Sequence, residues 1–453
     1  MAEMWEKMPG EMRMEIERIK STLRLTDKDQ VIQSPDNCER ALSQDPFIGK
    51  ALRHNVWSDT VEIIGDVGWN RSGSEMDDTD ISHIWLYMDR FYDQRNKQHV
   101  VAAINVVANG NPYDPVRNRL ESLVWDGQER IRYALHHFLG ADADDMTYEC
   151  FRVFLMGAIE RIYHPGAKVE NMLCLVGDQG AGKSSFFRFL AMEDDWFTDD
   201  LKYINDENVY RKLQGHWIIE MAEMLGTANA KSVEEIKSFL SRQEDIYKVP
   251  YETKAKSRPR KCVFVGTTNK QRFLPLDRTG NRRFLPILTD ASQAEAHVLE
   301  DTEATKDYMR QIWAEAMSMY QSGNKSMRLP PNMEKQMEQR RREFMAEDTT
   351  AGLIQLWLDE YKGDHVCTQM LYAEALHQFG KPDRASINEI NDIMDHSVDG
   401  WERASQHRFP KYGPQRAWKR VNKPTLCMDE ATQMEIPAEW LKSGPAGPSG
   451  EEK

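Results

Sequence analysis

The sequence has few cysteines, and they follow no pattern that would bind a metal or build a disulfide framework. Six cysteines occur in 453 residues, with no Cys-x-x-Cys pair and no Cys/His spacing typical of zinc. We therefore expect neither a disulfide scaffold nor a zinc site. No run approaches the ~18 apolar residues of a membrane-spanning helix, and the charged N-terminus lacks the apolar core of a signal peptide. These absences predict a cytoplasmic protein without a membrane partner.

Basic charge is also scarce over the chain as a whole. Lys and Arg total 59 against 73 Asp and Glu, which gives a formal net charge of −14. Binding nucleic acid over a wide area needs a basic surface that neutralises phosphates, so any DNA contact must be local. One segment, interrupted by a single acid, is basic enough for such a contact: Lys248, Lys254, Lys256, Arg258, Arg260 and Lys261. From composition alone, a solvated surface loop remains the alternative.

The strongest motif is a glycine-rich loop between an apolar run and a helical pattern. The apolar run Met172–Val176 has the length of a buried strand, and a helical pattern begins at Ser185. Between them the sequence fits GxxxxGK[ST], the pattern of a loop whose backbone N–H groups surround phosphates. The predicted nucleotide-binding residues are Gly177, Asp178, Gln179, Gly180, Ala181, Gly182, Lys183, Ser184 and Ser185. Lys183 is expected to reach the β- and γ-phosphates of ATP, and the Ser184 hydroxyl to bind Mg²⁺.

Two further apolar runs end in polar residues that suit phosphate chemistry. The run from Trp217 ends in Glu220 and Glu223, where a carboxylate can hold Mg²⁺ or polarise the attacking water. The run from Cys262 ends in Thr-Thr-Asn, and Asn269 can orient that water; a turn-capping asparagine is the alternative. A later loop carries Arg282 and Arg283, whose permanent charge suits an active site in a neighbouring subunit.

The patterns along the chain predict an α/β protein with several segments. These are a helical lead-in (1–40), a mainly helical domain (41–150), a P-loop ATPase domain (151–325), a helical linker (326–349), a winged-helix-like domain (350–421) and a disordered tail (422–453). Alternating strands and helices in the third segment predict a parallel sheet. The acids Asp77, Asp78 and Asp80, with His83, are interpreted as the start of a helix rather than as a metal site.

In their order, these motifs resemble the virulence-associated protein E family of replication proteins from phages and mobile elements. That family is related to the superfamily-three and poxvirus-type primase-helicases among the AAA+ ATPases. The resemblance covers roughly residues 40–320 and rests on the runs NPYDPVRNRLESLVWDGQERI, GDQGAGKSSF, WIIEMAEM, KSFLSRQEDIYKVPYE, VFVGTTN and FLPLDRTGNRRFLPI.

The resemblance implies an AAA+-type core in a hexameric ring that couples ATP hydrolysis, with Mg²⁺, to movement along single-stranded DNA. By position, Lys183 and Ser184 become the Walker A pair, Glu220 and Glu223 the Walker B acids, and Ser184 with Glu220 the metal-side residues. Asn269 becomes the sensor, and Arg282 or Arg283 the arginine that acts in a neighbouring subunit.

In superfamily-three helicases a hairpin before the sensor strand enters the central channel, which implies DNA contacts for the basic segment. The winged-helix-like end could contact duplex DNA through Arg408, Lys411 and Arg420. The implied partners are DNA, a primase and host replication proteins in a bacterial or host-cell cytoplasm.

Two other functions remain open on the sequence. An ATP-switched protein could mark an origin or recruit host factors without unwinding DNA. A P-loop kinase of a small metabolite would need a substrate pocket and a lid, and neither Thr-Thr-Asn nor the Asn-Arg-Arg-Phe run that contains Arg282 suggests them.

Overall fold

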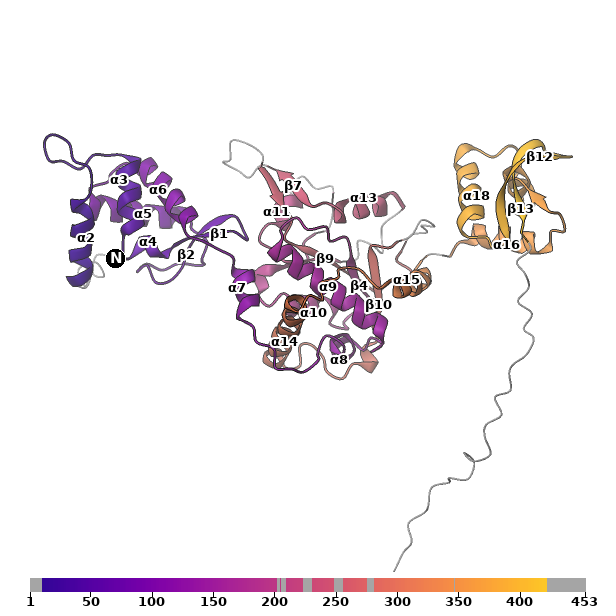
Figure 1. Ribbon diagram of the computed structural model, residues 1–453, viewed down its shortest axis with the longest axis horizontal. Helices are drawn as coiled ribbons and strands as arrows, with labels where there is room; N and C mark the ends of the chain where they lie inside the picture. Colours follow the sequence, from indigo (N-terminus) through magenta and orange to yellow (C-terminus); the bar gives the residue numbers. More distant parts are fainter. Residues whose placement is uncertain are drawn as a thin grey trace, which may run out of the picture. The chain divides into compact units, whose positions relative to one another are not determined.

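The chain divides into two units, each described here by itself. The computed structural model describes residues 10–201, 204, 209–222, 230–247, 256–274, 281–345 and 347–421. By its internal contacts the first unit is Met1–Glu347 and the second is Asp348–Lys453 (Figure 1). The predicted tail, residues 422–453, lies outside the described residues.

A five-stranded parallel sheet forms the centre of the first unit, as the alternating pattern predicted. Its strands are β4 (Met172–Val176), β5 (Phe197–Thr198), β6 (Ile218–Ala222), β9 (Val263–Thr268) and β10 (Phe284–Leu288). They stand in the order β10-β4-β9-β6-β5, and each neighbouring pair is parallel. Because parallel strands all end at one edge, the residues that follow β4, β6 and β9 are brought together there.

Both faces of this sheet are buried, since successive residues of a strand point to opposite sides. Leu173 and Leu175 belong to one hydrophobic core, whereas Met172, Cys174 and Val176 belong to the other. The first core includes residues of α9 (Asp145–Tyr163), α10 (Lys183–Leu190) and α14 (Thr302–Gln321). The second includes residues of α11 (Val209–Leu213) and α13 (Ala230–Leu240) (Figure 1).

A mainly helical part with its own core precedes the sheet. Its elements are α2 (Gly10–Ser21), α3 (Pro35–Gln44), α4 (Ile48–Ala51), β1 (Leu52–Asn55), β2 (Thr60–Ile63), α5 (Asp78–Tyr92), α6 (Lys97–Gly110) and β3 (Pro112–Tyr113). This core runs from Ile16 to Ala108, so the expected lead-in is part of it. From Val116 onward, through α7 (Pro115–Ser122), α8 (Ala134–Leu139) and α9, apolar side chains pack with the sheet instead. The cores therefore divide near residue 110 rather than at the expected boundary of 150.

The acids near residue 80 begin a helix, as the sequence analysis interpreted them. Asp77 caps α5 by accepting a hydrogen bond from the Asp80 backbone N–H, and the Asp80 carboxylate bonds the Asp77 backbone N–H in return. Arg71 pairs with the same buried Asp80, with Nε 2.9 Å from Oδ1. This carboxylate thus bonds the helix start and the Arg71 side chain.

The second unit, which α15 (Pro331–Glu343) precedes, joins helices to a three-stranded antiparallel sheet. In chain order it contains α16 (Thr349–Glu360), β11 (His365–Val366), α17 (Thr368–Met370), a π-helical turn η3 (Leu371–Ala375), α18 (Arg384–His396), β12 (Trp401–Phe409) and β13 (Gly413–Arg420). The sheet order is β11-β13-β12. Arg420 donates to the Leu358 carbonyl at 3.0 Å. Arg408 and Lys411 are both exposed, and Lys411 pairs with Glu374 at 3.3 Å. Nowhere in the described part of the chain is a helix both long enough and apolar enough to span a bilayer.

Trp217 joins three elements of the central core at the start of β6. Its ring stacks on Trp313 of α14 with centroids 4.3 Å apart, and its Nε1 donates to the Ala158 carbonyl of α9 at 3.3 Å. We predict that Trp217→Ala lowers the free energy of unfolding of this unit by about 3–5 kcal/mol, because the substitution leaves a cavity. The half-exposed Trp125 offers a matched control, and Trp125→Ala should cost less than about 1 kcal/mol. Equal losses in urea denaturation would contradict this assignment of Trp217.

Candidate nucleotide-binding site and basic hairpin

The glycine-rich loop has the backbone that its sequence predicts. It follows β4, and α10 begins at Lys183. Gly180 and Gly182 have φ angles of +84° and +79°, in the left-handed region that favours glycine. A Cβ on Gly177 would lie 2.2 Å from Thr289 Oγ1, so this position has no room for a side chain. Glycine is therefore favoured by the backbone conformation at Gly180 and Gly182 and by the close approach of Thr289 at Gly177.

Lys183 closes the loop on itself. Its side chain is buried, and Nζ donates to the carbonyls of Gly177 and Asp178 at 2.7 and 2.6 Å. These bonds hold the ammonium at the loop, where a phosphate chain surrounded by the loop's N–H groups would lie.

The Glu220 carboxylate connects the loop to two strands. Ser184, at the start of α10, donates from Oγ to Glu220 Oε1 at 2.7 Å, and Thr267 of β9 donates to the same oxygen. Glu220 is completely buried, and its Oε2 has no hydrogen-bond partner among the described residues. Burial raises the pKa of Glu220, while the two hydroxyl donors partly offset that rise. An unpartnered buried carboxylate oxygen beside a serine hydroxyl is a donor set that suits a hard divalent cation.

A cavity of about 570 Å³ brings the loop and the strand ends together. It is lined by Gln179–Ser185, Ala222, Thr267, Asn269, His297 and Leu299. Asn269 follows β9, which lies between β4 and β6, so its exposed side chain stands between the loop and the carboxylate strand. The expected site residues Lys183, Ser184, Glu220 and Asn269 thus meet at one edge of the sheet. Glu223 lies outside the described residues.

Sequence reasoning missed Thr267 and His297. Thr267 stands in the Thr-Thr-Asn run, and its hydroxyl bonds Glu220 because β9 and β6 are neighbours; only the strand order reveals that contact. His297 comes from the loop after β10, and its Nε2 would lie 3.4 Å from a Cβ on Gly182. No local pattern around residue 297 marks this approach.

Arg282 and Arg283 lie at the opposite edge of the sheet. Phe284 pairs with Met172, the first residue of β4, so both arginines precede the sheet where the glycine-rich loop follows it. The five residues of β4 separate these edges by roughly 16 Å at about 3.3 Å per residue. Arg283 bonds Ser241 at 2.9 Å and lies 3.6 Å from Glu170, whereas the Arg282 side chain is exposed. The structure does not bring these arginines to the phosphate loop of the same chain.

The basic segment forms part of a hairpin between β6 and β9. Strands β7 (Glu244–Tyr247) and β8 (Lys256–Pro259) pair antiparallel, and Lys248 and Lys254 lie in the connection outside the described residues. Lys256 is exposed. Arg258 lies 3.4 Å from Asp59 of the N-terminal part.

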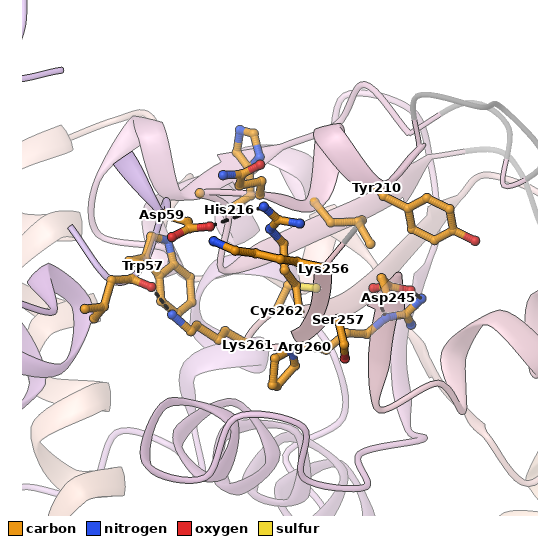
Figure 2. A pocket seen from close by; sticks show the side chains of 16 residues that line it. Trp57, Asp59, Tyr210, His216, Asp245, Lys256, Ser257, Arg260, Lys261 and Cys262 are labelled. Carbon is orange, nitrogen blue, oxygen red and sulfur yellow. Dashed lines mark hydrogen bonds and ion pairs between the residues drawn. The ribbon is translucent and has the colours of Figure 1, made fainter. Parts of the chain in front are cut away.

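For two of the expected DNA contacts the structure requires a correction. Arg260 is buried and bonds both oxygens of Asp245, at 2.6 and 2.8 Å, with its guanidinium 4.4 Å from the Phe239 ring. Lys261 donates to the Val56 carbonyl, and its Nζ lies 5.7 Å from the Trp57 ring (Figure 2). Because groups of the protein itself engage both charges, Arg260 and Lys261 stabilise the base of the hairpin. They do not present charge on its surface.

Comparison with known proteins identifies a family. Two solved structures titled as apo A forms of the NrS-1 C-terminal region are similar to this chain, at 13% and 12% identity with TM-scores of 0.47 and 0.48. The alignments cover 82% and 86% of this chain and 96% and 100% of those chains. No curated protein matches the chain. Residues 120–346, half of the sequence, match the virulence-associated protein E-like domain. The chain therefore belongs to the virulence-associated protein E-like domain family.

Proposed function

We propose that this protein is an ATP-driven DNA helicase, or a helicase-like replication initiator, of a phage or mobile genetic element. The observation that carries the proposal is the buried Glu220 carboxylate, which accepts from the loop's Ser184 and keeps one oxygen unpartnered among the described residues. Such an arrangement suits Mg²⁺ with a nucleoside triphosphate, and membership of the family supports a role in replication.

The residues would divide the work of ATP hydrolysis. Lys183 would leave its two loop carbonyls to hold the β- and γ-phosphates, and Asn269 would orient the attacking water. Ser184 and Glu220 would hold Mg²⁺, which when bound neutralises charge on the phosphates. Because Glu220 already accepts a hydrogen bond from Ser184, we assign it to Mg²⁺ binding. Glu223 then remains as the carboxylate that polarises the attacking water.

The order of elements supports the finer fold assignments. In the order β10-β4-β9-β6-β5, one strand separates the phosphate-loop strand from the carboxylate strand, which we take as an AAA+-type core with Asn269 as its sensor. In the second unit, the succession α16, β11, α17, α18, β12 and β13 supports a winged-helix-like domain. Of the basic residues expected to contact duplex DNA there, Arg408 and Lys411 are exposed.

A ring is supported by the position of the arginines. Arg282 cannot reach the phosphate loop of its own chain across the sheet, but a neighbouring copy in a cyclic assembly could receive it. The exposed Arg282 suits that role better than Arg283, which already contacts Ser241 and Glu170. We propose a hexamer on the basis of the family resemblance.

Glu220 should make the effect of Mg²⁺ on ATP binding depend on pH. Burial raises its pKa above the ordinary value of 4.5, and the cation binds only the deprotonated form. As pH falls through this raised pKa, the gain in ATP affinity from Mg²⁺ should shrink by up to about tenfold per pH unit. Thr267→Val removes a hydrogen bond that favours the carboxylate and should move the loss to higher pH. Fluorescent ATP titrations with and without Mg²⁺ measure both effects.

A matched control separates Glu220 from carboxylates in general. Glu220→Gln should abolish the gain from Mg²⁺ at every pH, whereas Glu303→Gln, at an exposed helix position, should behave as the wild type. If Glu220→Gln keeps the wild-type gain, Glu220 is not the metal-side acid.

A forked DNA with a single-stranded tail tests the proposed function. We expect the wild type to displace the strand only with ATP and Mg²⁺, and single-stranded DNA to stimulate ATP hydrolysis. Lys183→Ala should lower ATP hydrolysis by at least about 100-fold and stop strand displacement, because the lysine's positive charge next to the phosphates is lost. The exposed Lys306→Ala is the control and should retain activity.

Failure of this experiment has two distinct forms. DNA-stimulated hydrolysis without displacement on forks of either polarity would favour the ATP-switched binding protein. A well-folded wild type that does not hydrolyse ATP would refute the proposal.

Mixed assemblies test whether the site forms between subunits. Lys183→Ala and Arg282→Ala should each be nearly inactive alone, because an arginine that acts in trans contributes about 10³–10⁵ to phosphoryl transfer. Mixed in equal amounts, they should regain activity, since about a quarter of the interfaces of a closed ring would pair an intact lysine with an intact arginine. A mixture of Arg282→Ala with the Lys183→Ala/Arg282→Ala double variant should stay inactive. If the first mixture co-assembles without regaining hydrolysis, Arg282 does not act in trans.

A further inference from the structure

A cavity of about 440 Å³ lies in the second unit, between α18 and the hairpin of β12 and β13. Its apolar walls are formed by Pro382, Ile387, Ala404, Ala417 and Trp418. Ile387 is 36% exposed there, which is unusual for a large apolar side chain beside a hydrophobic core. The volume falls within the roughly 300–1,000 Å³ of ligand sites, and the walls suit a bulky apolar side chain.

The charged residues that line this cavity are all basic. Lys381, Arg403 and Arg416 contribute to it, and no described Asp or Glu does. Arg403 is already engaged, because its Nε donates to Asp395 Oδ1 at 2.7 Å. The exposed side chains of Lys381 and Arg416 make no ion pair or hydrogen bond with another described residue. The cavity therefore offers two cations to an acidic ligand that also carries an apolar group.

The chain contains an acidic segment of this kind within reach of the cavity. Residues 428–441 lie outside the described residues, and their sequence has no Lys or Arg. It has four acids, Asp429, Glu430, Glu435 and Glu439, and four large apolar residues, Met434, Ile436, Trp440 and Leu441.

The distance along the chain allows this segment to reach the cavity of its own copy. Trp418, which lines the cavity, comes three residues before Val421, or about 10 Å at about 3.3 Å per residue. Residues 422–427 then connect Val421 to the segment, and six extended residues span up to about 20 Å.

We infer that residues 428–441 of this chain bind in the cavity between α18 and the β12–β13 hairpin. The Trp440 side chain would lie against the apolar walls, and carboxylates of the segment would pair with Lys381 and Arg416. A tryptophan supplies a large apolar area, while the opposite charges fix its orientation. A short tether gives an effective concentration in the millimolar range, so even weak binding would keep the cavity occupied. The inference goes beyond the proposed function, because it involves neither ATP nor DNA.

A fluorescent peptide with the sequence of residues 428–441 tests the inference on the full chain. The wild type should bind it weakly, because its own segment occupies the cavity. The tail variant Glu439→Gln/Trp440→Ala should free the cavity and bind the peptide at least about tenfold more tightly in anisotropy titrations. The control Glu451→Gln/Glu452→Gln changes two acids outside the segment and should behave as the wild type.

Substitutions in the cavity locate the binding. Added to the tail variant, Arg416→Ala should weaken peptide binding about threefold, because one ion pair is lost. Lys419→Ala, which changes an exposed lysine of the same strand outside the lining, should not weaken it. Thermal unfolding shows whether each variant is folded, and Lys381→Ala serves if Arg416→Ala is not.

Four outcomes would overturn the inference. If the peptide binds the wild type as tightly as the tail variant and Arg416→Ala weakens both, the cavity takes a peptide of another protein. Binding that Arg416→Ala leaves unchanged would place the segment elsewhere. If a DNA oligonucleotide, but not the peptide, depends on Arg416, the cavity belongs to a DNA-contacting surface. A peptide that binds none of the folded variants also contradicts the inference. In each case the ATPase and fork assays decide the proposed function separately.

Discussion

The hydrogen bonds to the buried carboxylate of Glu220 are the interaction on which the site depends. Full burial of an acid is costly, and the hydroxyls of Ser184 and Thr267 offset part of that cost at one oxygen. The other oxygen has no hydrogen-bond partner among the described residues, and we propose that Mg²⁺ binds there. Ser184 lies in α10, Glu220 in β6 and Thr267 in β9. These hydrogen bonds therefore form only when β6 and β9 are neighbours next to the glycine-rich loop.

The parallel sheet separates the phosphate loop from the arginines of the same chain. Its parallel strands collect Ser184, Glu220 and Asn269 at one edge and leave Arg282 at the other, across the length of β4. We propose that a second copy of the chain supplies the arginine to this site. Two contacts stabilise the base of the hairpin between β6 and β9. They are the Arg260–Asp245 ion pair and the hydrogen bond from Lys261 to the turn between β1 and β2. We propose that nucleotide and a neighbouring subunit act at the edges of the central sheet, and that DNA acts on the separate two-stranded hairpin between β6 and β9.

Local patterns predicted what depends on neighbours in sequence. The glycines with positive φ, the polar ends of β6 and β9 and the capping acids at Asp77 and Asp80 could all be found this way. What failed were features decided by distant contacts. Arg260 looked like a surface charge because its partner Asp245 is 15 residues away on the paired strand. The boundary expected at residue 150 failed because α8 and α9 carry apolar faces that fit the sheet. His297 and Thr267 needed the strand order itself.

We propose that the ends of β4, β6 and β9 form one site for ATP with Mg²⁺. Calorimetric titration of ATP into the wild type and into Ser184→Ala, each with and without Mg²⁺, tests this site. We expect Mg²⁺ to strengthen ATP binding to the wild type, and this gain to be largely lost in Ser184→Ala, while binding without Mg²⁺ is similar in both proteins. ATP binding that is absent from the folded wild type, or an equal gain from Mg²⁺ in both proteins, would contradict it.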